Sequence, residues 1–144
     1  MTNDNSAQTL HASCVSLMGA GVLLLGPPGS GKSDLALRMI DMGAQLVADD
    51  QVRIAPRGAE LVAAPPPGLA GLLEVRGVGI YRLKHAPAEL KLAVKLVKPE
   101  EMERLPEAQF MDCLGLRLPL LSLAAFEAAT PAKIRLALRA EKHT

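Results

Sequence analysis

Residues 26–33 read Gly-Pro-Pro-Gly-Ser-Gly-Lys-Ser, and this segment limits what the chain can fold into more than any other. An apolar run at residues 22–25 precedes it, and an amphipathic segment at residues 34–40 follows it. A strand, a glycine-rich loop and a helix in this order are typical of a phosphate-binding P-loop, whose glycines let successive backbone N–H groups turn toward phosphate oxygens. The alternative is a Gly/Pro turn between a core strand and a surface helix.

The P-loop motif assigns a task to each of its polar residues. Lys32 is expected to reach the β- and γ-phosphates of a nucleoside triphosphate, and the Ser33 hydroxyl is expected to bind Mg²⁺. The positive end of the following helix points at the same anion. The residues predicted to hold a nucleotide or another polyphosphate are Gly26, Gly29, Ser30, Gly31, Lys32, Ser33 and Asp34.

The chain of 144 residues suffices for a single domain without disulfides or metal staples. We expect residues 1–8 to form a disordered lead-in and residues 9–144 to form one P-loop domain. The net charge is +1 and Trp is absent, with only two Phe and one Tyr, so the features of a nucleic-acid binder are missing. Cys14 and Cys113 lie among apolar neighbours, which favours buried free thiols and leaves their pairing as the alternative.

The N-terminal residues are polar and acidic, whereas a signal peptide would be basic and then apolar. No apolar run approaches the roughly 18 residues that span a bilayer. The sequence therefore predicts a soluble, cytoplasmic protein that binds neither a membrane nor a nucleic acid.

Short apolar stretches separated by Gly or Pro predict a strand-rich fold. Residues 10–18 and 22–25 are expected to form a hairpin, and residues 32–42 the P-loop helix, which Gly43 ends. Two helices cannot cover both faces of a large parallel sheet, so we expect an α/β fold with few helices and a mixed, largely antiparallel sheet. Further strands are expected at residues 45–48, 52–55, 60–63, 72–76, 79–83, 90–97 and 113–118, and a last helix at residues 131–140 with Thr130 as its N-cap.

Asp49 and Asp50 follow the strand that comes after the P-loop helix. A carboxylate that binds the metal or acts as a general base would lie at this place beside the γ-phosphate. A solvated turn is the alternative, but the apolar residues directly before the pair favour a functional role.

Glu74 and Arg76 are two residues apart, so on an extended strand they point to one face. Glu74 is a candidate Mg²⁺ ligand, and Arg76 is a candidate for binding the transferred phosphate. An exposed ion pair across two strands is the alternative. His11, expected on the strand before the P-loop, is on its own more typical of a structural residue than of a catalyst.

Four segments resemble, in order and spacing, the catalytic domain of bacterial HPr kinase/phosphorylase. They are His11-Ala12-Ser13, the loop GPPGSGKSDLALR, the run LVADDQV at residues 46–52 and the run EVRGVGI at residues 74–80. The resemblance covers roughly residues 9–138, and P-loop proteins at large do not share its last two runs. It implies a P-loop kinase core of the phosphoenolpyruvate carboxykinase-like type. The implied activity is ATP- and Mg²⁺-dependent phosphorylation of a serine of the phosphocarrier protein HPr, with reverse phosphorolysis by inorganic phosphate.

The resemblance also implies roles for single residues. Asp49 is similar to the base that takes the proton of the substrate serine, and Lys32 to the P-loop lysine. Arg76 matches the signature arginine, and His11 the histidine close to the aspartates. The implied metal ligands are Ser33, Asp50 and Glu74.

The chain resembles a short form, equivalent to the C-terminal catalytic domain only, because the separate N-terminal domain and the arginine-containing loop of full-length members have no counterpart here. Lys133 and Arg135 are candidates for replacing the charge of that loop. The sequence does not decide whether the protein forms a homo-oligomer.

Two other functions remain open from the sequence. A nucleotide-binding regulatory module of the phosphotransferase system would bind ATP, phosphate or pyrophosphate without catalysis, and it would have little need of a base beside the γ-phosphate. A small-molecule kinase or carboxykinase relative is less favoured, because the chain has no obvious lid or substrate domain.

Overall fold

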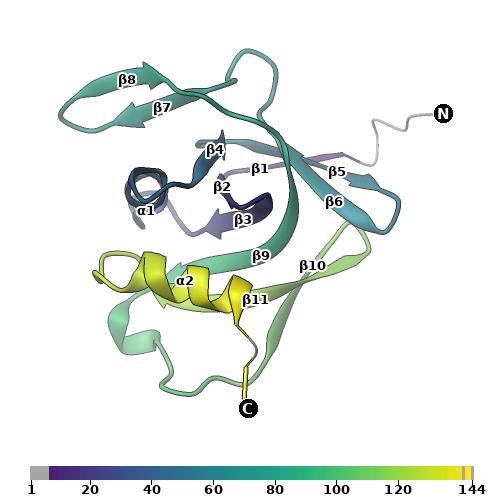
Figure 1. Ribbon diagram of the computed structural model, residues 1–144, viewed down its shortest axis with the longest axis vertical. Coiled ribbons are helices and arrows are strands. Elements are labelled where there is room, and N and C mark those ends of the chain that lie inside the picture. The colour runs from purple at the N-terminus through teal and green to yellow at the C-terminus, as the bar shows by residue number, and fades with distance from the viewer. Residues whose placement is uncertain (1–6, 141, 144) are drawn as a thin grey trace.

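The central element of the fold is strand β9 (Ala88–Val97), and the computed structural model describes residues 7–140, 142 and 143 around it (Figure 1). Strand β3 (Ala20–Leu25) pairs with β9 in parallel along one edge. On the opposite edge, β6 (Glu60–Ala64) pairs antiparallel with the start of β9, and β11 (Leu116–Ala124) pairs in parallel with its end. The sheet therefore divides at β9 into two branches.

The remaining strands extend these branches. The order on the main path is β1-β5-β6-β9-β3-β2-β4, and β10 pairs with β11. Apart from the two parallel pairs at β9, the pairings of this sheet are antiparallel, so the expected mixed and largely antiparallel sheet is confirmed. The bounds are β1 (Gln8–Leu10), β2 (Ser13–Leu17), β4 (Gln45–Ala48), β5 (Val52–Arg57) and β10 (Gln109–Cys113).

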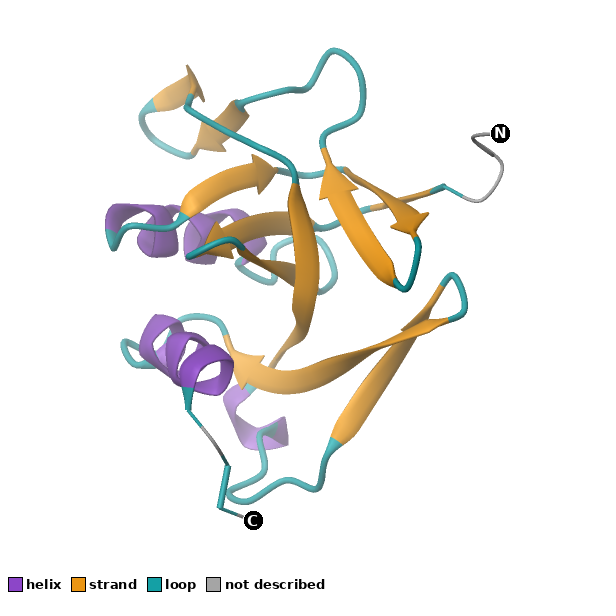
Figure 2. Ribbon diagram, turned by 45° about the vertical axis from the view of Figure 1, so that its right-hand side comes forward, coloured by secondary structure: helices purple, strands orange, loops and turns teal. Residues whose placement is uncertain are grey.

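Both faces of the central strands are buried, which explains the continuous apolar run before the P-loop. Along β3, Leu23 packs into one core cluster with Val47 and Ile54, while its neighbours Val22 and Leu24 pack into the other. The second cluster includes the helices α1 (Lys32–Asp41) and α2 (Thr130–Arg139), which lie on the same side of the sheet (Figure 1, Figure 2). The two cores fix β3, and with it the start of the P-loop.

Helix α1 forms as the sequence predicts. Leu35, Ala36 and Met39 are its buried stripe, as 3.6-residue periodicity requires. Gly43 has a φ of +107° and directly follows the C-cap Met42, so the helix ends where a glycine permits the left-handed turn.

A separate two-stranded hairpin, β7 (Leu72–Val75) and β8 (Gly79–Arg82), lies at the upper left of Figure 1. Leu73 is buried and β7 contacts α1, which places this hairpin near the P-loop helix. Strand β8 is exposed, whereas Leu72 and Val75 of β7 are half-buried, and the hairpin carries the Glu74–Arg76 segment toward the site.

The structure corrects the expected strand at residues 113–118. Two strands meet there, and Leu114 and Gly115 form the turn between β10 and β11 with φ of +50° and +83°. A turn with positive φ at both central residues matches strand twist, but leucine gives no sequence signal for it. Because Leu114 is apolar, the sequence pattern predicted one continuous strand where the structure has a turn.

The expected N-cap of the last helix is also wrong. Ala129 is the N-cap, and Thr130 is already helical with its hydroxyl donating to the Ala124 carbonyl, 2.5 Å away. The hydroxyl therefore ties the helix to the end of β11 instead of capping it. A short helical turn, η2 (Pro99–Glu101), occupies the charged segment after β9.

Of the expected lead-in at residues 1–8, residues 1–6 lie outside the described part of the chain, and Gln8 already pairs with Ile54 in β1. Cys14 and Cys113 are both buried and free, which confirms the favoured interpretation. Within the described residues, neither of the ten-residue helices nor any other is long and apolar enough to span a membrane.

Candidate functional site

The loop between β3 and α1 forms a cradle of backbone amides. Gly29 and Gly31 have φ of +80° and +101°, which L-residues rarely adopt. The Ser30 N–H donates to the Pro27 carbonyl over 3.1 Å, and the first helical bond runs from the Leu35 N–H to the Gly31 carbonyl over 2.9 Å. Backbone amides before that bond have no acceptor within the helix, so they are available to an anion at its positive end.

Two side chains of the loop, Lys32 and Ser30, pack against its backbone. The Lys32 ammonium donates to the carbonyls of Gly26 and Pro27, at 2.5 and 3.2 Å, so it lies over the cradle. Ser30 Oγ is buried and has no hydrogen-bond partner among the described residues. A Cβ on Gly26 would lie 2.4 Å from that oxygen, which explains why glycine is needed at this close approach.

Asp49 faces the cradle from the end of β4. Its Oδ1 accepts hydrogen bonds from the hydroxyls of Ser33 and Ser13, at 2.8 and 2.7 Å, and the residue is only 9% exposed. The antiparallel pairing that joins Cys14 to Ala48 brings Ser13 beside Asp49. Because the Ser33 hydroxyl donates a hydrogen bond to the carboxylate, its oxygen lone pairs remain available to a cation.

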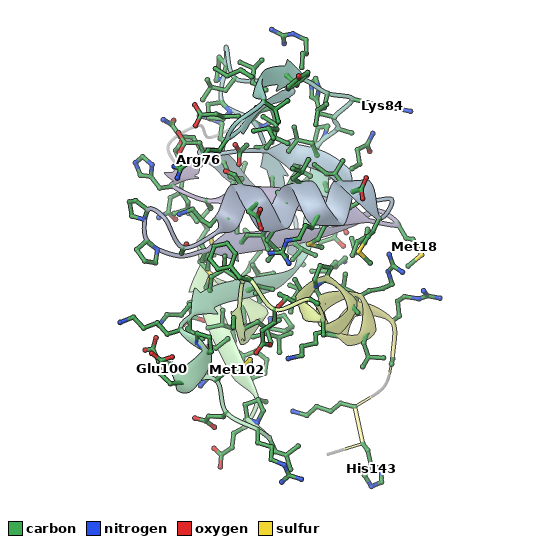
Figure 3. All side chains as sticks on the ribbon, turned by 90° about the vertical axis from the view of Figure 1, so that its left-hand side faces the viewer. Met18, Arg76, Lys84, Glu100, Met102 and His143 are labelled. Atoms are coloured by element: carbon green, nitrogen blue, oxygen red, sulfur yellow. The ribbon has the colours of Figure 1, made fainter. Side chains whose placement is uncertain are left out.

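A cavity of about 380 Å³ extends from this cradle to the β7–β8 hairpin. Glu74 and Arg76 line it from the hairpin, opposite Lys32 and Ser33 of the cradle. Figure 3 shows Arg76 beside one end of α1 and Met18 beyond the other end. The ion pairs between described residues involve neither Glu74 nor Arg76, and the functional roles of these two residues stay a prediction.

Asp34 also lines the cavity, but its carboxylate pairs with Arg38 on the next helical turn at 2.9 Å. The carboxylate itself cannot donate to a phosphate, so a contribution of Asp34 to anion binding rests on its backbone N–H.

Five predicted site residues that the structure describes are not part of the cavity lining: Gly26, Ser30, Asp49, Asp50 and His11. Gly26 and Ser30 belong to the loop itself, and Asp49 contacts it through Ser33. Asp50 is exposed with a φ of +68°, because the Gln51 N–H bonds back to the Asp49 carbonyl over 2.7 Å and turns the chain between the two aspartates. His11 is exposed in the bend between β1 and β2, not on a strand as expected.

The oxygen atoms at the site suit a hard divalent cation, although only a few side chains supply them. Ser33, the Asp49 carboxylate beside it and Glu74 across the cavity supply the oxygen ligands that Mg²⁺ prefers. Among the residues that the structure describes, no three His, Cys, Asp or Glu side chains converge as a ready-made metal cage. Mg²⁺ typically keeps several waters and uses substrate phosphates as ligands, so a cage is not required.

Sequence reasoning missed four contributors, namely Ser13, Leu37, Val75 and Phe126. Ser13 orients Asp49 through a strand pairing that no local pattern reveals. Leu37 and Phe126 line the cavity, and Phe126 comes from the far end of the chain. The only available signal was that Phe126 is one of three aromatic side chains.

Cysteine chemistry is not available at the site. Cys14 neighbours Ser13 on β2, but it is fully buried, and this burial raises the pKa of its thiol to about 12. The thiol stays protonated at neutral pH and is a poor nucleophile.

The chain is similar to known proteins over most of its length. The family model of the HPr Serine kinase C-terminal domain matches residues 4–135. An HPr kinase/phosphorylase of Cupriavidus metallidurans is 39% identical over 127 residues, which are 80% of this chain and 39% of that protein. One of Burkholderia lata is 45% identical over 120 residues, which are 75% of this chain and 37% of that protein. The chain thus spans about two fifths of the length of these relatives.

The fold has a solved counterpart as well. The structure of the Hpr(Ser) kinase/phosphatase from Coxiella burnetii matches with a TM-score of 0.81 and 29% identity, over 92% of this chain and 88% of that one. The family model covers most of the chain and the structural match nearly all of it. The chain therefore belongs to the family of the HPr serine kinase C-terminal domain.

Proposed function

We propose that this protein is an ATP- and Mg²⁺-dependent protein-serine kinase that phosphorylates a serine of the carrier protein HPr in the cytoplasm. The observation that carries the proposal is the bond between Ser33 of the P-loop and Asp49 at the neighbouring strand end. In a P-loop this hydroxyl binds the Mg²⁺ of the nucleotide, so an acidic side chain bonded to it supports a role for Asp49 near the terminal phosphate. The family membership supplies HPr as the substrate, through the names of the relatives.

Each residue of the site has a task in this reaction. The loop amides and Lys32 bind the phosphates of ATP, and Arg76 neutralises charge on the transferred group. The serine oxygen of HPr bonds to the γ-phosphorus while the bond to the β,γ-bridging oxygen breaks, so ADP leaves. Asp49 takes the serine proton. The hydroxyls of Ser13 and Ser33 both donate to Oδ1 of this carboxylate, so Oδ2 is the oxygen left for that proton.

Mg²⁺ would be held by Ser33 and Glu74 together with phosphate oxygens, and it would supply charge neutralisation. Asp50 is a candidate for a ligand through water, because it directly follows Asp49. His11 lies two residues before Ser13, and a role near the aspartates stays part of the proposal.

The test is phosphoryl transfer from labelled ATP to HPr, read as phosphoserine by mass spectrometry. Asp49→Asn keeps an acceptor oxygen for Ser13 and Ser33 but removes the base, and we expect transfer to fall by about 100- to 10,000-fold. Lys32→Ala should lower transfer by about 100-fold or more. Asp41→Ala, at the exposed end of α1, is the matched acidic control and should retain full activity.

Transfer retained by both site variants would refute the proposal. ATP binding by the wild type without any phosphoserine would favour a regulatory module instead. Removing divalent cations with a chelator should stop transfer, and Mg²⁺ should restore it. Phosphorolysis of phosphorylated HPr by inorganic phosphate is measured separately, because this reverse reaction is implied only by the family.

A further inference from the structure

Phe126 is an exposed aromatic side chain at the rim of the phosphate cradle. It is 69% exposed and lines the same cavity as Lys32 and Ser33. Its ring rests against the P-loop, because a Cβ on Gly31 would lie 2.8 Å from Phe126 Cζ. Leu37 and Val75 also line this cavity, so it offers an apolar wall beside its phosphate-binding residues.

The backbone on both sides of Phe126 is fixed. The guanidinium of Arg38 donates to the carbonyl of Ala125 and, over 3.3 Å, to that of Glu127, so one side chain holds both neighbours of Phe126. Lys133 forms an ion pair with the Glu127 carboxylate at 3.0 Å. The segment after β11 is therefore held by α1 from one side and by α2 from the other.

An exposed aromatic ring on an anchored backbone, next to a phosphate site, suits stacking. Nucleotides carry a flat π-face at the end opposite their phosphates, and protein aromatic rings stack on such faces with little dependence on the base. Ligand pockets combine apolar and aromatic walls with a few fixed polar groups, as this cavity does. Holding the ring in place beforehand lowers the entropic cost of binding.

The geometry points to Phe126 as the stacking platform for the base of the bound nucleotide, with Arg38 as the residue that positions it. This inference rests on the proposed function, because it takes ATP as the ligand of the cradle. It adds the residue that distinguishes a nucleotide from a bare polyphosphate, a distinction that the P-loop itself does not make.

The experiment compares two ligands that share phosphates and differ in the base. Dissociation constants of ATP and of tripolyphosphate are measured by calorimetry for the wild type, Phe126→Ala and Phe126→Tyr. We expect Phe126→Ala to weaken the binding of ATP about tenfold and to leave the binding of tripolyphosphate unchanged. Phe126→Tyr should retain both affinities. Phe110→Ala is the matched control, because Phe110 is also exposed but lies on β10 under Arg117, whose guanidinium carbon is 3.9 Å from the ring centroid.

A direct spectroscopic readout is available because the chain contains no Trp. In Phe126→Trp the single indole should change its emission on adding ATP and stay unchanged with tripolyphosphate. Arg38→Ala should weaken ATP binding when Phe126 is present. In the Phe126→Ala variant it should have no further effect on ATP affinity. That non-additivity distinguishes positioning of the ring from a general loss of structure.

The outcomes are separable. If Phe126→Ala leaves ATP affinity unchanged, or weakens both ligands equally, the stacking role is refuted while the kinase proposal stands. If the wild type binds neither ligand, the proposed function itself fails, and this inference fails with it.

Discussion

At the scale of single residues, Gly31 shows why the loop sequence is so restricted. Its φ of +101° is strained for any side chain, and an added Cβ would approach Phe126 Cζ to 2.8 Å and Ala125 Cβ to 2.9 Å. Gly19, in the turn between β2 and β3, has a similar φ of +83°, but a Cβ there meets nothing within 4 Å. A substitution at Gly19 therefore tests backbone strain alone, whereas one at Gly31 tests backbone strain together with crowding at the site.

We expect Gly31→Ala and Gly19→Ala to share a loss of about 1–2 kcal/mol in the free energy of unfolding, because both force L-alanine into left-handed backbone. Only Gly31→Ala should also weaken ATP binding, because its methyl group displaces Phe126 from the cradle. Urea denaturation and calorimetry measure the two effects. Equal ATP affinity in both variants would contradict the close packing of Phe126 on the P-loop.

Asp49 and Asp50 show how far adjacent residues can diverge. The sequence places both at the end of β4, yet only Asp49 bonds to Ser33. The reason is the backbone reversal at Asp50, which a pattern of residue types does not reveal.

At the scale of elements, the P-loop helix and the last helix differ in predictability. The start and stripe of α1 follow from local signals, namely glycines, an apolar period of 3.6 and Gly43. Helix α2 begins at Thr130, whose hydroxyl reaches six residues back to the Ala124 carbonyl. This contact joins two elements, so a local capping rule led to the wrong role for Thr130.

Thr130→Val should destabilise the fold by about 1–3 kcal/mol, because the isosteric methyl group leaves the buried Ala124 carbonyl without its donor. Thr130→Ser keeps the hydroxyl and should retain most of the stability. The midpoints of chemical denaturation distinguish the two variants. If Ser and Val substitutions are equally costly, the methyl group of Thr130 matters and not its hydrogen bond.

At the scale of the whole molecule, two core clusters on opposite faces of the sheet fix the site. Cys14 belongs to the cluster that includes Leu23, Val47 and Ile54, and it is completely buried. Burial raises the pKa of the Cys14 thiol from 9.0 to about 12 and also raises the pKa of Cys113. The stability of the core is therefore linked to pH in the alkaline range.

Because the pKa of Cys14 is higher in the folded state, the unfolded state releases its proton first as the pH rises. The contribution of the neutral thiol is fully present below pH 9.0 and is lost between there and about pH 12, at up to about 1.4 kcal/mol per pH unit. Cys14→Ala should lower the free energy of unfolding at neutral pH. Above pH 9 the free energy of unfolding of this variant should fall less steeply than that of the wild type. Free energies of unfolding measured from pH 8 to 10.5 test this, and parallel curves for the two proteins would argue against it.

The glycine-rich loop and the helix after it could be predicted from the sequence alone, because both depend on residues close together in the chain. The mixed character of the sheet was predicted from the small number of helices, although its pairings join distant strands. Gly29, Gly31, Lys32 and Ser33 carry their geometry in their own backbone preferences and in the start of one helix. The position of Asp49 at a strand end followed from the same local pattern, since β4 ends at Ala48 as expected.

Only the tertiary structure decided what meets the P-loop from elsewhere. Ser13 reaches Asp49 through the pairing of β2 with β4, and Phe126 reaches Gly31 from the segment before the last helix. Arg38, on α1, reaches the carbonyls on either side of Phe126. Such contacts depend on how two packed core clusters orient whole elements, and local propensity has no information about residues that are dozens of positions apart.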